Sequence, residues 1–167
     1  MPSQQVLLID GYNVINRVPE LKAGLDEGLE SARNKLAVLI SRWSQRHPAV
    51  ECVIIFDGDI RFSGGRDHRL AGIRCIFSRT SHGGDDAVIR FVREYRGRTS
   101  DITVVSDDNY VRNNCRAHGA SVKPSSFIMS AKKRPSFGGA KSQDAGKGID
   151  RKTAAEIDRE LMRKFGL

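Results

Sequence analysis

Five aspartates stand where an apolar run gives way to a loop or a helix. Asp10, Asp57 and Asp108 each lie at or just beyond the end of such a run, and Asp85 and Asp86 begin a helical segment after another. The carboxyl ends of parallel strands share one edge of a sheet, so these carboxylates are expected to converge. At about 4 Å, two like charges repel by roughly 4 kcal/mol at an effective dielectric constant near 20. A divalent cation relieves such repulsion, and all-oxygen ligands favour Mg²⁺ or Mn²⁺ over zinc.

A cation at that edge can hold phosphate oxygens, activate water and stabilise a leaving oxygen, which is the chemistry of phosphodiester hydrolysis. A single aspartate after a strand is more often a helix cap or a turn former, and Asp107 and Asp59 taken alone fit that description. Asp85 could equally be a carboxylate stabilised by a helix dipole. Asp10, Asp86 and Asp108 together are better explained by convergence on one edge.

The first of these acids opens the segment Asp10-Gly11-Tyr12-Asn13. Gly11 permits a tight turn, so Asn13 can orient Asp10 or hold a metal-bound water or a phosphate; capping the next turn is the alternative for Asn13. Tyr12 can belong to the core or stack on a base, and the sequence leaves both possibilities open.

The pattern of apolar residues places these acids on an alternating series of strands and helices. Continuous apolar runs predict buried strands, and three- and four-residue spacing predicts amphipathic helices. Strands are expected at 6–9, 52–56, 73–77, 102–105 and 120–122, and helices at 27–46, 86–95 and 109–118. The polar, Gly-rich segment 58–71 is expected to form a loop.

Alternation of this kind predicts an α/β protein with three layers, a central mostly parallel sheet between helices. We expect residues 1–129 to form the domain. Residues 130–152, rich in glycine and basic side chains, predict a flexible linker, and residues 153–167 carry the apolar stripe of a final helix that docks on the domain. The length of 167 residues is ample for one core.

Charge and cysteine content narrow the functional classes. The net charge is +8, and the last 38 residues carry 10 of the 28 basic residues against 5 of the 20 acidic ones, which favours a polyanionic partner such as nucleic acid. Cys52, Cys75 and Cys115 match no metal-binding spacing and predict buried free thiols. No membrane span or secretory signal is evident, so we expect a cytoplasmic protein.

Four segments resemble the motifs of NYN-domain nucleases, specifically the YacP-like branch: DGYNVI at 10–15, FDG at 56–58, DDAVI at 85–89 and VVSDD at 104–108. The likeness extends over residues 6–128, and the final helix is similar too. The resemblance implies a PIN-like fold and metal-dependent endoribonuclease activity in a bacterial cytosol. It also implies that Asp86 and Asp108, rather than their neighbours Asp85 and Asp107, are the metal ligands.

Basic residues beside the acidic edge are candidate RNA contacts, although each could also be solvated surface charge. They are Arg61, Arg66 and Arg69 in the loop after Asp57, Arg79 after the third strand, and Lys132, Lys133 and Arg134 in the linker. His68 and His82 are weaker candidates for supporting roles. Aromatic residues make up 7% of the chain, too few to indicate a platform for stacking bases.

We therefore expect a Mg²⁺- or Mn²⁺-dependent endoribonuclease in which Asp10, Asp86 and Asp108 bind metal, Asn13 takes part in catalysis, and Asp57, Asp85 and Asp107 support them. The ribosome is a conceivable partner. The alternative is an RNA- or ribosome-binding module of the same fold with little catalysis. A phosphotransferase with an aspartate nucleophile is disfavoured because Tyr12 stands where a second acid is needed. A dinucleotide-dependent oxidoreductase is disfavoured because no GxGxxG follows the first strand.

Overall fold

The structure, a computed structural model, describes residues 3–58, 68–78 and 86–130. The chain divides into two compact units, residues 1–129 and 130–167, and the first is described below. Its centre is a six-stranded sheet in the order β3-β4-β2-β1-β5-β6, parallel except for the pairing of β3 with β4. The strands are β1 (Gln5–Asp10), β2 (Val50–Asp57), β3 (His68–Leu70), β4 (Ile73–Ser78), β5 (Ile102–Val105) and β6 (Ser121–Lys123).

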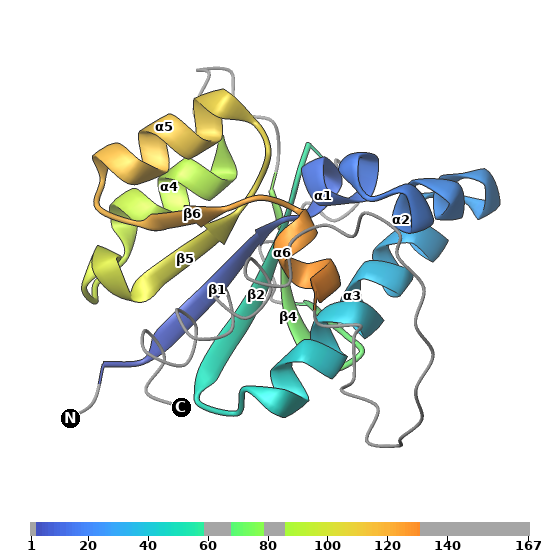
Figure 1. The fold of residues 1–167 in the computed structure, drawn as a ribbon, viewed down its shortest axis with the longest axis horizontal. Coiled ribbons are helices and arrows are strands. Elements are labelled where there is room, and N and C mark those ends of the chain that lie inside the picture. The colour runs from blue at the N-terminus through green and yellow to red at the C-terminus, as the bar shows by residue number, and fades with distance from the viewer. Residues whose placement is uncertain (1–2, 59–67, 79–85, 131–167) are drawn as a thin grey trace, which may run out of the picture. The chain divides into compact units, whose positions relative to one another are not determined.

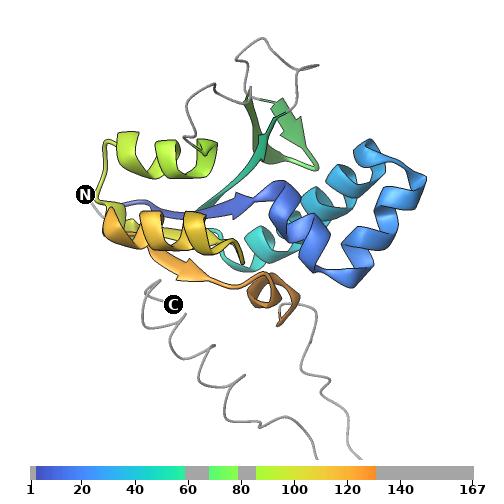
Figure 2. The ribbon, with the colours of Figure 1, turned by 90° about the horizontal axis from the view of Figure 1, so that it is seen from above.

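Helices cover both faces of the sheet, which confirms the expected three-layer α/β architecture (Figures 1 and 2). Helices α4 and α5 lie on one face and α3 on the other. The helices are α1 (Gly11–Arg17), α2 (Pro19–Ala23), α3 (Leu29–Arg46), α4 (Ala87–Glu94), α5 (Asn109–Ala117) and α6 (Ser126–Met129), with short 3-10 turns η1 (Gly24–Glu27) and η3 (Thr99–Asp101).

The five strands and three helices expected from the sequence are all present, with ends shifted by a few residues. Three features were not foreseen. The segment after Asp10 continues directly into α1, α2 and η1, residues 126–129 form α6, and the segment expected as a loop at 58–71 contributes the short strand β3. The predicted linker and C-terminal helix lie outside the described residues.

Alternation along the strands divides the core between the two faces, because successive side chains point to opposite sides. Val6 and Leu8 of β1 pack in one cluster with Val88 and Val92 of α4 and Val111 of α5. Leu7 and Ile9 alternate with them and are fully buried toward the face that carries α3. Both faces of β1 are therefore covered, which explains its continuous apolar run.

All three cysteines are buried and free, as the sequence predicted. Burial raises the pKa of the Cys52 and Cys115 thiols to about 12 and that of Cys75 to about 11. A thiol with so high a pKa stays protonated at neutral pH and is a poor nucleophile or metal ligand.

The order of the strands creates a switch point between β1 and β5. The chain builds outward from β1 through β2 to β4, and then returns to the other side of β1 to form β5 and β6. Crevices outside the carboxyl ends of strands form where the direction of winding reverses. Asp10 ends β1 and Ser106 follows β5, so the switch point falls between two segments that carry candidate site residues.

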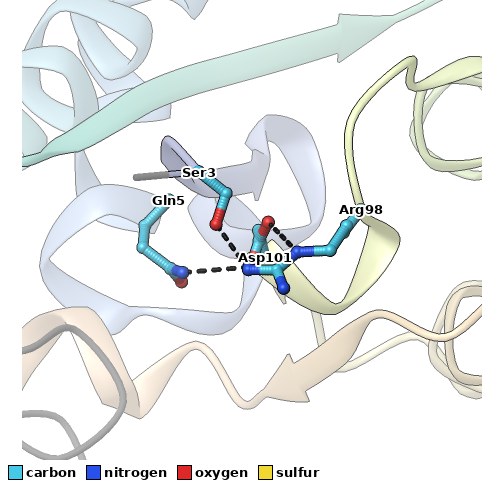
Figure 3. Close-up of polar contacts among 4 residues, drawn as sticks. All are labelled: Ser3, Gln5, Arg98 and Asp101. Carbon is cyan, nitrogen blue, oxygen red and sulfur yellow. Dashed lines mark hydrogen bonds and ion pairs between the residues drawn. The ribbon is translucent and has the colours of Figure 1, made fainter. Parts of the chain in front are cut away.

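Hydrogen bonds around the buried carboxylate of Asp101 connect the starts of β1 and β5 (Figure 3). Arg98 donates from Nε to Asp101 Oδ2 at 3.1 Å, and Gln5 donates to Oδ1 at 3.2 Å. Arg98 also donates to Ser3 Oγ at 2.6 Å. Burial acts to raise the pKa of Asp101, but hydrogen bonds led by that from Arg98 outweigh it and lower the pKa. The network links the starts of β1 and β5.

Gly11 is required by the close approach of α1 to β2. A Cβ at Gly11 would lie 2.6 Å from the Phe56 ring and 2.8 Å from the backbone oxygen of Ile55. At Gly24 the nearest atom to an added Cβ is the flexible Lys35 side chain at 3.1 Å. We expect Gly11→Ala to lower the free energy of unfolding by about 1–3 kcal/mol, whereas Gly24→Ala changes it little. Urea unfolding followed by the single tryptophan, Trp43, measures both; equal effects would contradict this packing.

Candidate active site

The buried Ser106 hydroxyl joins the ends of β1 and β5. Ser106 Oγ donates to Asp10 Oδ2 at 2.9 Å and accepts from the backbone N–H of Asp108 at 3.1 Å. The serine is fully buried and the side chain of Asp10 is nearly so. The Ser106 N–H donates to the Lys123 carbonyl at 3.1 Å, which extends the pairing of β5 with β6 past the last strand residue. One hydroxyl thus fixes Asp10 relative to the turn that carries Asp108.

Asn13 is held by the same turn. Its Oδ1 accepts from the backbone N–H of Asp107 at 2.8 Å and lies 3.4 Å from Ser106 Oγ. Because the amide oxygen accepts from that backbone donor, the orientation of the Asn13 amide is fixed. Its Nδ2 group is then the one that can donate to a ligand. Asn13 and Asp10 therefore both approach the Ser106 hydroxyl.

Asp86 and Asp108 both cap helices. Asp86 Oδ1 accepts from the Val88 N–H at 2.8 Å at the start of α4, and Asp108 Oδ1 accepts from the Val111 N–H at 3.1 Å at the start of α5. The capping role weighed as an alternative is therefore real for both residues. It also anchors each carboxylate rigidly at a helix N-terminus, where the dipole stabilises negative charge.

Asp57 is tied to the start of α4 from the end of β2. Its Oδ1 accepts from Ser78 Oγ at 2.5 Å, and its Oδ2 accepts from the Ala87 N–H at 3.3 Å. Ser78 lies opposite Asp57 in the pairing of β2 with β4. The carboxylate thus joins the ends of two strands to the residue after Asp86.

The pKa of Asp10 is consistent with convergence of these four carboxylates. Burial, the largest cause, and the negative charges of Asp86, Asp108 and Asp57 together raise the pKa of Asp10 to about 7, against the opposing hydrogen bond from Ser106. Burial is also the main cause that raises the pKa of Asp86, with Asp57 and Asp108 adding to it. The described residues form no ion pair between Asp10 and a lysine or arginine. The edge is therefore a concentrated site of negative charge.

The oxygen donors gathered at this edge suit a hard divalent cation by their chemistry. Among the described residues, however, no three His, Cys, Asp or Glu side chains are grouped closely enough to form a metal site. Mg²⁺ usually keeps several waters and needs only one or two protein carboxylates. The arrangement fits that mode of binding rather than a closed cage of three carboxylates.

Asp107 has a different role from its neighbour. Its carboxylate accepts hydrogen bonds from the hydroxyl and the backbone N–H of Ser125, the latter at 3.2 Å from Oδ2. Ser125 is buried and immediately precedes α6. Asp107 therefore fastens the β5–α5 turn to the segment that leads into α6.

The structure places only some of the other candidates. Arg69 is exposed on β3, where it pairs with Arg74 and donates to the Gly72 carbonyl at 3.0 Å. Arg74 lies four residues, or about 13 Å, before the end of β4, so Arg69 is displaced from the acidic edge. His68 contacts Phe77 edge-on at 5.4 Å between ring centroids. Outside the described residues lie Arg61, Arg66, Arg79, His82, Asp85, Lys132, Lys133 and Arg134.

The buried Arg33, which no pattern in the sequence singles out, contacts the start of α1 directly after Asp10. Arg33 of α3 donates to the Tyr12 hydroxyl from Nε at 3.0 Å, and its guanidinium lies 5.4–5.7 Å from the ring centroids of Tyr12, Phe56 and Phe77. Tyr12 itself packs on Phe56 at 5.1 Å. Tyr12 is thus part of the packing that supports α1, which answers the question left open by the sequence.

The fold is a three-layer α/β protein with an acidic edge at its switch point. A family model, the YacP-like NYN domain, matches residues 7–166. The chain belongs to this family, which is a family of RNA-related nucleases.

Solved structures show the same fold. The crystal structure of Rae1 (YacP) from Bacillus subtilis is 17% identical with a TM-score of 0.53, and covers 95% of this chain and 78% of that chain. A tryptophan-to-leucine mutant of that protein is 18% identical with a TM-score of 0.56, and covers 95% and 80%. A comparison with curated proteins finds no significant match. Within the described part of the chain, no helix has the length and apolar character needed to cross a membrane.

The raised pKa of Asp10 implies that the free energy of unfolding depends on pH. Between its ordinary pKa of 3.8 and about 7, the folded state holds a proton that the unfolded state lacks, so the stability contributed by this group is lost as pH rises through 7. In EDTA at about pH 8, Asp10→Asn should raise the free energy of unfolding by on the order of 2–4 kcal/mol. Near pH 4 the gain should vanish. Urea unfolding at both pH values measures it.

Asp26→Asn is the matched control, because it removes the same charge from an exposed position on η1. The convergence of the carboxylates would be contradicted if Asp10→Asn were no more stable than the wild type at about pH 8, or if its effect were the same at both pH values.

Proposed function

We propose that the protein is a divalent-metal-dependent endoribonuclease that hydrolyses RNA at the acidic edge of its sheet. The main support for the proposal is the convergence of four carboxylates at the switch point, those of Asp10, Asp57, Asp86 and Asp108. Their mutual repulsion contributes to the raised pKa of Asp10. Mutual repulsion among four carboxylates in one place destabilises the fold. A bound divalent cation offsets this repulsion and can take part in phosphodiester hydrolysis.

Two further observations support RNA as the substrate. The chain belongs to an RNA-related nuclease family. Its net charge of +8 favours a polyanion in general, while the negative edge itself would repel one without a cation. We propose that Arg61, Arg66 and Arg79 guide RNA to the edge and that Lys132, Lys133 and Arg134 extend the path. A ribosome-associated RNA in the cytoplasm is one substrate that this scheme accommodates.

Asp10, Asp86 and Asp108 would bind Mg²⁺ or Mn²⁺ in this proposal; because such an ion keeps several of its waters, not all three carboxylates need to contact it directly. The ion, when bound, supplies Lewis-acid stabilisation of phosphate oxygens and a nucleophile at neutral pH. The protein's own residues supply position. Ser106 holds Asp10, and the first turns of α4 and α5 hold Asp86 and Asp108, so the three carboxylates keep their places without a ligand.

Asn13 and Asp57 would act around these ligands. With its Oδ1 occupied by the Asp107 N–H, Asn13 would offer Nδ2 to a phosphate oxygen of the substrate. Asp57, bound to Ser78 and to the N–H of Ala87, would keep the start of α4 and thus Asp86 in register with β2. The first residue touches the substrate in this scheme, and the second acts through Asp86.

Cleavage of a long structured RNA tests the function. The wild type should cut it with Mn²⁺ or Mg²⁺ and fail to cut it in EDTA, and Asp10→Asn should reduce the rate by more than about 100-fold. Asp26→Asn should cut normally. If wild type and Asp10→Asn both leave the RNA intact but shift it in a gel, the protein is a binding module. Equal cutting by both would place the chemistry elsewhere.

The dual role of Asp86 and Asp108 allows a sharper test. Asparagine caps a helix about as well as aspartate does, so the free energy of unfolding of Asp86→Asn and Asp108→Asn should be no more than about 1 kcal/mol below that of the wild type. Each should nevertheless lose cleavage by more than about 100-fold, because a charged metal ligand is replaced by a neutral amide. Active asparagine variants would show that these residues are caps alone.

A further inference from the structure

A pocket of about 370 Å³ adjoins the acidic edge, and none of its walls is one of the proposed metal ligands. Its lining residues come from the junction of α1 with α2, from the β5–α5 turn and from the short helix α6. Its walls include Arg17, Val18, Pro19, Glu20, Asp107, Ser126 and Met129. Resting on the function proposed above, we propose that this pocket binds the base of a nucleotide next to the scissile phosphate.

The β5–α5 turn links the pocket to the acidic edge. Asp107 forms part of its wall, while the Asp107 backbone N–H donates to Asn13 Oδ1 at 2.8 Å. Asp108 is the next residue. At the other side, α1 runs from Gly11, directly after Asp10, to Arg17 at the pocket, a rise of about 10 Å. An RNA strand that places one phosphate at the carboxylates therefore has a neighbouring nucleotide within reach of the pocket.

The walls suit a base and its phosphate. Val18, Pro19 and Met129 supply apolar surface for the flat face of a base. The Asp107 and Glu20 carboxylates and the Ser126 hydroxyl supply acceptors for N–H groups on its edge. The exposed Arg17 guanidinium can contact a phosphate or stack on the ring. A volume near 370 Å³ lies in the range of small-molecule sites, and this mixture of apolar walls with few polar groups is typical of them.

The pocket is also preorganised. Asp107 is fixed by two donors of Ser125, and Ser125 and Val18 are both buried. The Val18 N–H donates to the Val14 carbonyl at 3.0 Å, which closes the end of α1. A ligand would thus enter a site whose wall is already ordered, so little conformational entropy is lost on binding.

Binding can be measured apart from cleavage. The full-length protein, isotope-labelled and in EDTA, is titrated with guanosine monophosphate, whose base carries two adjacent N–H donors, and in parallel with ribose phosphate. Amide NMR should show shifts at residues 17–20 and 125–129 for the nucleotide, with ribose phosphate binding at least about tenfold more weakly. Equal affinity for both compounds, or shifts confined to other residues, would overturn the proposal.

Variants then connect the pocket to the reaction. Ser126→Leu narrows the pocket at an exposed position, and Arg17→Gln removes its cation; each should weaken nucleotide binding at least about tenfold and raise KM for RNA while kcat changes little. Arg116→Gln, on the far end of α5, is the matched control and should change neither. Unchanged binding and KM in Ser126→Leu and Arg17→Gln would contradict the assignment.

The two proposals fail in different ways. Metal-dependent cleavage with the same KM and the same cut sites in Ser126→Leu would overturn the base subsite and leave the nuclease intact. If a nucleotide binds at residues 17–20 and 125–129 but the protein does not cut RNA, the pocket is supported as a nucleotide site and the proposed nuclease function is contradicted.

Discussion

Repulsion among carboxylates is the constraint around which this domain is organised. Asp10, Asp57, Asp86 and Asp108 meet at the carboxyl edge of the sheet, and each is restrained by a specific donor: a serine hydroxyl for Asp10 and Asp57, and a helix N-terminus for Asp86 and Asp108. Those donors keep charged groups together that would otherwise separate. The buried Ser106 hydroxyl is central, because it contacts both sides of the switch point between β1 and β5.

The two ends of the β1–β5 pair each hold a buried aspartate, and the pKa values of these two carboxyl groups shift in opposite directions. At one end, Asp101 accepts hydrogen bonds from Arg98 and Gln5, and its pKa falls. At the other, burial and neighbouring acids raise the pKa of Asp10 to about 7. Asp101 therefore stabilises the sheet, whereas Asp10 is held at a cost to stability. Residues that are strained electrostatically in this way mark functional sites, and here the strained end is the one at the switch point.

The strands and the long helix were predictable because their signals are local. The apolar runs of β1, β2 and β5 and the periodicity of α3 are visible in the sequence, and parallel strands bring the acids at their ends to one edge. The three-residue strand β3 has no such signal, since it exists by pairing with β4. Nor could the sequence assign a role to Ser106, Ser78 or Arg33, because their partners Asp10, Asp57 and Tyr12 are distant in the chain. The separate role of Asp107 likewise depends on Ser125.

The central claim is that the converged carboxylates bind a divalent cation, and calorimetric titration of the full-length protein with Mn²⁺ tests it most directly. The account predicts saturable binding to the wild type, release of protons near pH 7 as Asp10 ionises, and affinity at least about tenfold weaker in Asp10→Asn, with Asp26→Asn unchanged. Equal affinity of wild type and Asp10→Asn for Mn²⁺, or the absence of any saturable binding to the wild type, would contradict it.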